Sequence, residues 1–233
     1  MDLKNKYAVV TGVSKGIGEA MVKGLLAEGV IVFGLGRNPW PHQHTNFTFI
    51  QCDVQQYPEV EKAFTQILQA TNQQLHILLN NAGLGYFGNV EDLPLSEWHE
   101  MTRTNVDAMF YCTRLAVPVM KAGGSGHILN IASTAGLEGM PMVSGYCATK
   151  WAVKGFSESL WRELRDFKIK VTCVYPGSVK TDFFRNSPNI QPHDYMLMPD
   201  DIAGMMLYAL KTPDNFHQVN LEVRPLQPKG PRI

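Results

Sequence analysis

The sequence lacks features that would divide the chain or place it in a membrane. No Pro/Ser-rich linker, charge run, low-complexity tract or internal repeat interrupts its 233 residues, so one domain spanning residues 1–233 is expected. No apolar run approaches the roughly 20 residues that cross a bilayer. Residues 1–6 are polar and lead directly into an apolar segment. We therefore expect a cytoplasmic protein with no membrane contact.

An excess of one charge is also missing. Lys+Arg and Asp+Glu balance at 21 each, which gives no electrostatic reason to expect nucleic acid or an anionic membrane as a partner. The four cysteines lie far apart without metal-ligand spacing, and His42 and His44 have no further ligands nearby. We therefore expect reduced structural thiols, solvated histidines and no metal site, with small molecules and other subunits as partners.

What the sequence does contain is an alternation of short apolar runs with helical patterns. Such an alternation is typical of an α/β fold of the Rossmann type, a doubly wound parallel sheet with helices on both faces. A long helix is expected over 96–121, which Pro118 kinks or ends, and a last helix over 199–210. About seven strands are expected, at residues 7–11, 30–35, 48–52, 76–80, 127–131, 170–174 and 219–223.

A glycine-rich turn joins the first strand to the first helix. Its sequence is Gly12-Val-Ser-Lys-Gly16-Ile-Gly18. Glycines permit a tight turn and a close approach of a pyrophosphate, and the free N–H groups of a helix start attract negative charge. This setting favours a dinucleotide site over a turn that only connects two elements.

The end of the second strand favours one of two cofactors. An acidic residue there would bind a ribose hydroxyl, but the chain has Gly36 and Arg37. Arg37 and Lys15 are suited to a 2′-phosphate, which favours NADP(H) over NAD(H); the alternative is that both are ordinary surface cations. Asp53, after the third strand, either meets the adenine edge or caps the helix that begins near Pro58.

Tyr146 and Lys150 are the candidates for acid–base chemistry. One helical turn separates them, so both lie on one face. A fixed cation lowers the pKa of a phenol, and the pair could then move a proton near pH 7; the alternative is a solvated face. Ser133 follows the fifth strand and either forms a turn or donates to a substrate oxygen. Asn105, within the long helix, faces water or supports an internal water or a backbone carbonyl.

These motifs occur together and in order over nearly the whole chain, and the chain closely resembles the short-chain dehydrogenase/reductase family. The ordered set comprises the glycine turn, Asn81-Ala82-Gly83, Asn105, Ser133, the Tyr146/Lys150 pair and Pro176-Gly177. The resemblance implies that Tyr146 is the proton donor or acceptor and that Lys150 lowers its pKa and holds the nicotinamide ribose. It also implies that Ser133 orients a substrate carbonyl and that Asn105 supports a water leading to Lys150.

The same resemblance implies an NADP(H) site. Gly36-Arg37 is similar to the NADP-preferring members, in agreement with the charges. The implied contacts are Gly12, Ser14, Lys15, Gly16, Ile17 and Gly18 at the pyrophosphate turn, Arg37, Asp53 and Val54 at the adenosine, Asn81, Ala82 and Gly83 near a ribose, Tyr146 and Lys150, and Pro176, Gly177, Val179 and Thr181 at the nicotinamide.

The implied activity is NADP(H)-dependent interconversion of a ketone or 3-oxo group and a secondary alcohol. The residues flanking the motifs predict an apolar pocket, and hence a hydrophobic or acyl-chain carbonyl compound: Tyr86, Phe87, Met140, Met142, Phe183 and Phe184. The stripe from Trp151 to Leu164 is core or subunit interface, and by resemblance a homodimer or homotetramer is expected. The alternative function is a non-catalytic NADP(H)-binding sensor, which would not need Tyr146 and its cation.

Overall fold

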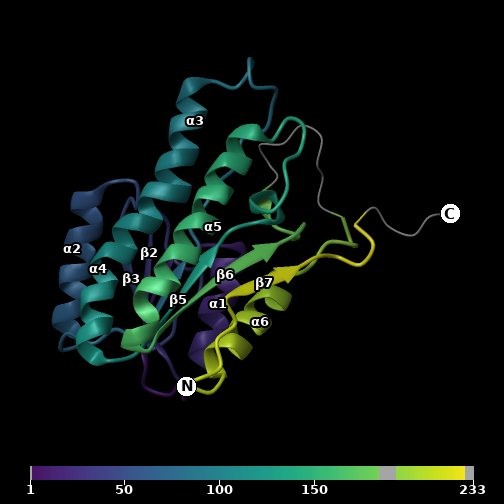
Figure 1. The fold of residues 1–233 in the computed structure, drawn as a ribbon. Coiled ribbons are helices and arrows are strands. Elements are labelled where there is room, and N and C mark those ends of the chain that lie inside the picture. Colours follow the sequence, from purple (N-terminus) through teal and green to yellow (C-terminus); the bar gives the residue numbers. More distant parts are fainter. Residues whose placement is uncertain (1, 184–192, 229–233) are drawn as a thin grey trace.

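Seven strands form one sheet in the computed structural model, which describes residues 2–183 and 193–228. All neighbouring strands are parallel, in the order β3-β2-β1-β4-β5-β6-β7 (Figure 1). The winding reverses between β1 and β4, as in the doubly wound sheet that the alternating pattern predicts. The strands are β1 (Tyr7–Thr11), β2 (Ile31–Gly36), β3 (Phe47–Gln51), β4 (Ile77–Asn80), β5 (Gly126–Ile131), β6 (Ile169–Pro176) and β7 (Asn220–Val223).

Helices cover both faces of this sheet (Figure 1). α1 (Gly16–Ala27) and α6 (Pro199–Lys211) pack together on one face, and α2 (Tyr57–Ala70), α4 (Ala108–Gly123) and α5 (Ser144–Leu164) cover the other. Shorter segments are α3 (Leu95–Thr102), the π-helical η1 (Arg103–Asp107), and the 3₁₀ turns η2 (Thr134–Gly136) and η3 (Arg165–Phe167). No helix in the described part of the chain is long and apolar enough to cross a membrane.

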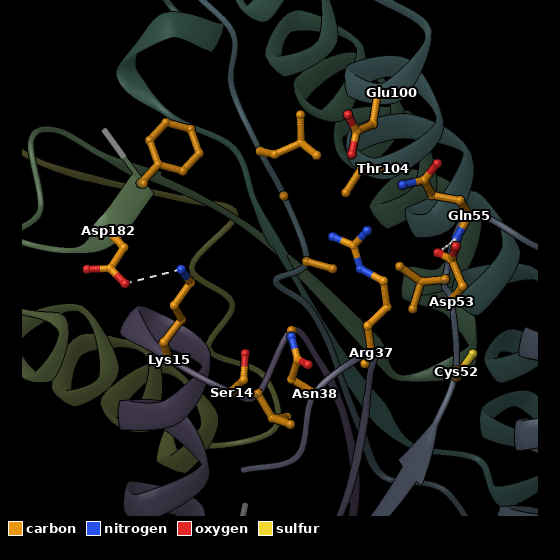
Figure 2. Close-up of a pocket in the computed structure, with 18 of the residues that line it drawn as sticks. Ser14, Lys15, Arg37, Asn38, Cys52, Asp53, Gln55, Glu100, Thr104 and Asp182 are labelled. Carbon is orange, nitrogen blue, oxygen red and sulfur yellow. Dashed lines mark hydrogen bonds and ion pairs between the residues drawn. The ribbon is translucent and has the colours of Figure 1, made fainter. Parts of the chain in front are cut away.

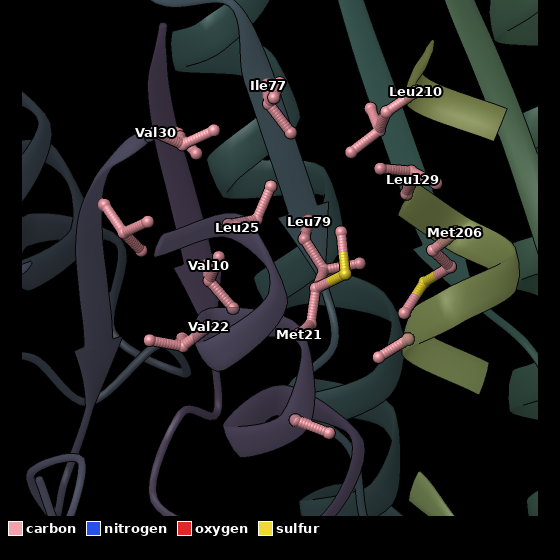
Figure 3. Close-up of a cluster of buried hydrophobic side chains, with 14 of the residues drawn as sticks. Val10, Met21, Val22, Leu25, Val30, Ile77, Leu79, Leu129, Met206 and Leu210 are labelled. Atoms are coloured by element: carbon pink, nitrogen blue, oxygen red, sulfur yellow. The ribbon is translucent and has the colours of Figure 1, made fainter. Parts of the chain in front are cut away.

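Apolar side chains fill the space on both sides of the sheet. Figure 3 shows the layer under α1 and α6, where Met21 and Leu25 of α1 and Met206 of α6 meet Val10 of β1 and Leu79 of β4. Val9 points the opposite way, into the layer under α2, α4 and α5. A strand buried on both faces has no polar face, which is why the strand segments read as continuous apolar runs. Full burial of one such side chain stabilises the fold by about 1.5–3 kcal/mol.

The long helix predicted over 96–121 is the main departure from expectation. It is interrupted by the π-helical segment η1, which carries Asn105, and Pro118 does not end it. α4 continues to Gly123, and Gly124 closes it with a left-handed backbone conformation at φ 66°. A π-helical turn widens the helix locally and is frequent where a side chain is needed at a functional site.

Candidate functional site

The carboxyl ends of the strands border a cleft formed by two adjoining cavities. We name them by the roles that the sequence predicts, the nucleotide end, of about 230 Å³, and the catalytic end, of about 330 Å³. They share Gly12, Lys15, Ala82, Gly83 and Phe183. Of the predicted site residues, all but Gly18 and Asn105 line one cavity or both. The nucleotide end adds Ser14, Arg37, Asp53 and Val54; the catalytic end adds Gly16, Ile17, Asn81, Ser133, Tyr146, Lys150, Pro176, Gly177, Val179 and Thr181.

The glycine turn is packed so closely that a side chain at Gly12 or Gly18 would clash with neighbouring atoms. Gly12 has φ +71°, and a Cβ atom on Gly18 would lie 2.1 Å from the Gly12 carbonyl oxygen. Asn81 Nδ2 fixes the turn by donating to the carbonyl oxygens of Thr11 and Gly12, both at 3.0 Å. No side chain caps the start of α1, so the N–H groups of its first turn remain available to an anion. The turn therefore fits the pyrophosphate of a dinucleotide.

Arg37 and Lys15 border the nucleotide end on different sides (Figure 2). Lys15 Nζ lies 3.2 Å from Asp182 Oδ2, so this cation is already paired. Arg37 is exposed and has no ion pair or hydrogen bond with the described residues. Both cations thus border the nucleotide end, and of the two only Arg37 has no partner among the described residues. Their joint binding of a 2′-phosphate stays a prediction.

Asp53 lies on the Arg37 side of the same cavity (Figure 2). Its Oδ1 accepts a hydrogen bond from Gln55 N at 3.1 Å, and its own N–H donates to Glu59 Oε2 at 2.8 Å. The residue preceding α2 is Gln56, which makes no side-chain cap. The interpretation of Asp53 as a helix cap is therefore wrong, and its carboxylate stays at the cavity.

Tyr146 and Lys150 lie on the inner face of α5, at the catalytic end. They are 7% and 4% exposed, so the solvated-face alternative is wrong. Lys150 Nζ lies 5.6 Å from the centre of the Tyr146 ring and donates to the Ile131 carbonyl oxygen at 2.8 Å. Ser133 Oγ accepts from Ala135 N at 3.2 Å, which fixes the turn after β5 beside Tyr146.

The pKa shifts of this pair favour the neutral forms. Burial raises the pKa of Tyr146 above its ordinary value, opposed by a hydrogen bond with the Ser133 side chain and reinforced by Cys147. Burial also lowers the pKa of Lys150 to about 8. Burial is the largest cause of both shifts. The expectation that the lysine lowers the tyrosine pKa stays a prediction.

Asn105 lies behind this pair, buried, and not in the cleft itself. Its side chain accepts from Leu84 N at 2.9 Å and donates to Leu84 O at 2.8 Å. It also donates to Thr149 Oγ1 at 2.9 Å. Asn105 thus joins the loop after β4 to α5, which matches the predicted contact with a backbone carbonyl and not exposure to water.

A family model for short chain dehydrogenases matches residues 6–191 of this chain. The chain belongs to the short-chain dehydrogenase/reductase family. It is 35% identical over 232 residues to an uncharacterized oxidoreductase of Staphylococcus aureus, an alignment that covers 96% of this chain and 99% of that protein. The chain is accordingly an NAD(P)-binding oxidoreductase of this family.

Solved structures agree with the family. An alcohol dehydrogenase of the archaeon Thermococcus sibiricus, complexed with 5-hydroxy-NADP, superposes with a TM-score of 0.86 at 26% identity, covering 99% of this chain and 100% of that one. A 3-ketoacyl-(acyl-carrier-protein) reductase of Brucella melitensis, complexed with NADH, gives a TM-score of 0.88 at 26% identity, covering 97% and 99%. Neighbours in the short-chain family thus bind either nicotinamide cofactor.

Aromatic residues enclose the catalytic end. The Tyr146 ring lies 5.8 Å from the Phe87 ring and 5.5 Å from the Phe183 ring, between centres. Met140 lines the same cavity, whereas Tyr86 lines the nucleotide end. Met142, which was also predicted to flank the pocket, does not line either cavity, and Phe184 lies outside the described residues.

Several residues of the short-chain site were not found from the sequence. Thr11 Oγ1 accepts from the N–H groups of Asn81 and Ala82, at 3.0 and 2.9 Å, and so joins β1 to the loop after β4. Glu100 lines the nucleotide end and accepts from the Tyr86 hydroxyl at 2.8 Å. Threonine is common in strands and glutamate is common in helices, so neither residue stood out in the sequence as a functional candidate.

The remaining predictions concern the cysteines, the histidines and the stripe on α5. The four cysteines are buried and free, and Cys52 lines the nucleotide end. His42 is exposed and pairs with Glu19 at 2.9 Å, and no group that could hold a metal occurs among the described residues. On the α5 stripe, Leu160 and Leu164 are in the core, whereas Trp151 is 46% exposed. The interpretation as a subunit interface stays a prediction.

Proposed function

We propose that this protein is an NADP(H)-dependent reductase that interconverts a ketone and a secondary alcohol. The observation that carries the proposal is the meeting of Tyr146, Lys150 and Ser133 at one end of a cleft whose other end is the open glycine turn. A phenol, a serine hydroxyl and a buried lysine beside a dinucleotide-sized cleft are suited to moving a proton to or from an oxygen.

Each chain residue has a distinct task in this proposal. When bound, the nicotinamide cofactor supplies or accepts the hydride. The Ser133 hydroxyl donates to the substrate oxygen and orients it, and the Tyr146 hydroxyl gives that oxygen its proton. The Tyr146 phenol carries its proton at neutral pH, as a proton donor in the reducing direction must. Asn105 positions the loop after β4 against α5.

The preference for NADP(H) rests on Arg37. The neighbouring structures bind NADP or NADH, so the fold leaves the choice to local residues. A guanidinium with no partner among the described residues, placed at the nucleotide end, suits the additional phosphate. The residues proposed to hold the cofactor are those predicted from the sequence, with Lys15 shared between Asp182 and the phosphates.

We further propose an apolar or acyl-chain carbonyl substrate. Phe87, Met140, Val143 and Phe183 line the catalytic end around Tyr146. An acyl chain or a hydrophobic ring loses its hydration favourably in such surroundings, at about 25 cal/mol per Å² of apolar surface, while a small polar ketone would leave this surface unfilled.

The test is NADPH consumption by the purified protein over a carbonyl panel that runs from small polar ketones to acyl thioesters and bulky rings. The proposal predicts turnover with NADPH that rises with the apolar area of the substrate. Turnover of small polar ketones alone would contradict the substrate class. Binding of NADPH without turnover of any member would favour a cofactor-binding sensor.

A further inference from the structure

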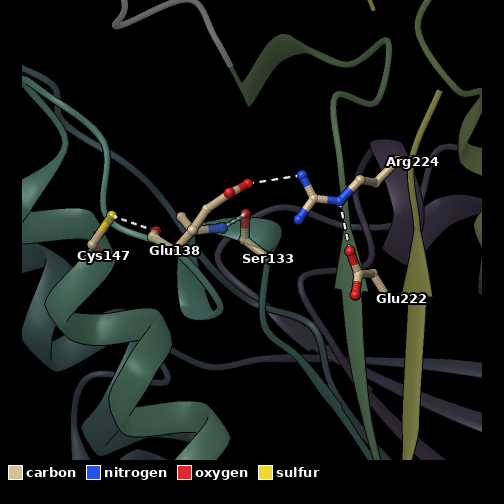
Figure 4. Close-up of polar contacts among 6 residues, drawn as sticks. Ser133, Glu138, Cys147, Glu222 and Arg224 are labelled. Carbon is tan, nitrogen blue, oxygen red and sulfur yellow. Dashed lines mark hydrogen bonds and ion pairs between the residues drawn. The ribbon is translucent and has the colours of Figure 1, made fainter. Parts of the chain in front are cut away.

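Arg224 connects two distant parts of the chain near the turn that carries Ser133 (Figure 4). It follows β7 directly, and its Nε lies 2.6 Å from Glu222 Oε1, within the same segment. A second nitrogen, Nη1, lies 2.8 Å from Glu138 Oε1, which is 86 positions away in the chain. One guanidinium thus has a local partner and a distant one.

Glu138 belongs to the turn that carries Ser133. Its N–H donates to the Thr134 carbonyl oxygen at 3.2 Å, one residue after Ser133. Its own carbonyl oxygen accepts from Cys147 Sγ at 3.7 Å, and Cys147 is the neighbour of Tyr146 on α5 (Figure 4). Glu138 therefore connects the Ser133 turn to the helix that carries the tyrosine.

The backbone at Arg224 is itself held against the opposite wall of the cleft. Gly177 N donates to the Val223 carbonyl oxygen at 2.7 Å. A Cβ atom on Gly177 would lie 3.3 Å from the Arg224 Cα and 3.0 Å from the Pro225 Cδ. The segment after β7 therefore crosses closely over Gly177, which lines the catalytic end. This contact gives the Arg224 side chain a fixed base from which to reach Glu138.

We infer that Arg224 is a positioning residue that acts through Glu138 to hold the Ser133 turn against α5. The predicted effect on catalysis rests on the proposed function, because it assumes that Ser133 orients the substrate. The predicted effect on the position of the turn does not depend on the proposed function. The rival explanation is that Arg224 only stabilises the end of β7, for which Glu222 would matter as much as Glu138.

Three variants separate these explanations. Glu138→Gln removes the distant partner, Glu222→Gln removes the local partner with the same change of charge, and Arg224→Gln removes both. Denaturant midpoints first establish that each variant is folded. The structural readout is the rate at which iodoacetamide modifies Cys147, compared with Cys173 in the same protein by peptide mapping. Cys173 is also buried, on β6, and has no contact with Glu138.

We expect Cys147 to react about two- to fivefold faster in Glu138→Gln and Arg224→Gln, the size typical of an exposed charge pair, and at the wild-type rate in Glu222→Gln. With an active substrate, kcat should fall by a similar factor in the same two variants while the Kd for NADPH stays unchanged. Molar salt screens the ion pair between Arg224 and Glu138, so it should raise the rate of Cys147 modification in the wild type toward the rate in Glu138→Gln.

Equal behaviour of Glu138→Gln and Glu222→Gln in the cysteine readout would overturn the inference. If the wild type does turn over a carbonyl, an unchanged kcat in Glu138→Gln would also overturn the inference. This holds even if Cys147 is modified faster in that variant. If the wild type turns over no carbonyl, the proposed function fails on its own account, and the Cys147 rates then decide whether Arg224 holds the turn.

Discussion

Asn105 Nδ2 donates to Thr149 Oγ1 across 2.9 Å, and the same amide group holds both backbone groups of Leu84. Asn105 is 3% exposed and Thr149 is buried, whereas Leu84 is half-buried. Asn105→Ala would leave the N–H and the carbonyl of Leu84 without their partner. Each buried polar group left in this way costs about 1–3 kcal/mol.

We therefore predict that Asn105→Ala lowers the free energy of unfolding by about 2–4 kcal/mol in a urea titration. Thr149→Val is the comparison, because it keeps the shape of the side chain and leaves both bonds to Leu84 intact. It removes the bond from Asn105 and the bond from Thr149 Oγ1 to the Tyr146 carbonyl oxygen at 2.8 Å. It should cost less than Asn105→Ala. A loss below about 1 kcal/mol in Asn105→Ala would show that the loop after β4 does not depend on this amide.

Arg37 should set the cofactor preference. Because a charge-assisted hydrogen bond contributes about 1.5–3 kcal/mol, Arg37→Ala should weaken NADPH binding roughly tenfold to a hundredfold. NADH binding, which lacks the phosphate, should change less than about twofold. Calorimetry or cofactor fluorescence measures both.

Lys15→Ala is the comparison for Arg37→Ala, and it should cost less NADPH affinity because Lys15 is already paired with Asp182. Asp182→Asn should free Lys15 and tighten NADPH binding a few-fold. Equal losses of NADPH and NADH affinity in Arg37→Ala would contradict the assignment of Arg37 to the phosphate.

His127 should make the fold sensitive to acid. It is 1% exposed, its Nε2 lies 2.8 Å from Thr172 Oγ1, and its ring lies 6.3 Å from that of His217. Burial lowers its pKa to about 3, assisted by the charges of His217 and Lys170. The unfolded chain therefore takes up this proton first, so the contribution of His127 is complete above its ordinary pKa of 6.5 and is lost as the pH falls toward about 3.

Between pH 7 and pH 5 the unfolded chain binds a proton at His127 that the folded chain does not bind. The free energy of unfolding of the wild type should therefore fall by about 2 kcal/mol over this interval. In His127→Leu the fall should be smaller by about 2 kcal/mol, whatever the stability of this variant at pH 7. Urea titrations at the two pH values measure both losses. His217→Leu serves as a control for the neighbouring ring. Equal losses in wild type and His127→Leu would contradict the low pKa of His127.

Much of the fold and of the cleft follows from local sequence. Strands buried on both faces give uninterrupted apolar runs, and their carboxyl ends must meet at one edge of a parallel sheet. Motifs at those ends, such as Gly12 and Ser133, are therefore brought together by topology alone. Helical spacing likewise places Tyr146 and Lys150 on one face of α5.

Other features depend on contacts that no local pattern carries. The π-helical turn at Asn105 is held by Leu84 and Thr149, from two other segments. The pairing of Lys15 with Asp182 joins residues 167 positions apart. The raised pKa of Tyr146 depends on how completely the surrounding chain removes water, and sequence spacing does not measure that quantity.

The central claim is that the Tyr146 hydroxyl gives the substrate oxygen its proton. Replacement of Tyr146 by phenylalanine tests this claim most directly. Tyr146→Phe keeps the ring that packs against Phe87 and Phe183 and removes only the hydroxyl. Tyr175→Phe is the matched control, because Tyr175 is a second buried tyrosine whose hydroxyl bonds Asn220 at 3.0 Å, away from both cavities.

The decisive measurement is NADPH oxidation with the best carbonyl substrate, accompanied by the Kd for NADPH, in wild type and both variants. We predict that Tyr146→Phe lowers kcat by about 10²–10⁴-fold with an unchanged Kd, and that Tyr175→Phe keeps kcat within about threefold. Turnover that persists in Tyr146→Phe at the wild-type rate would contradict the account, because the proton would then come from another group.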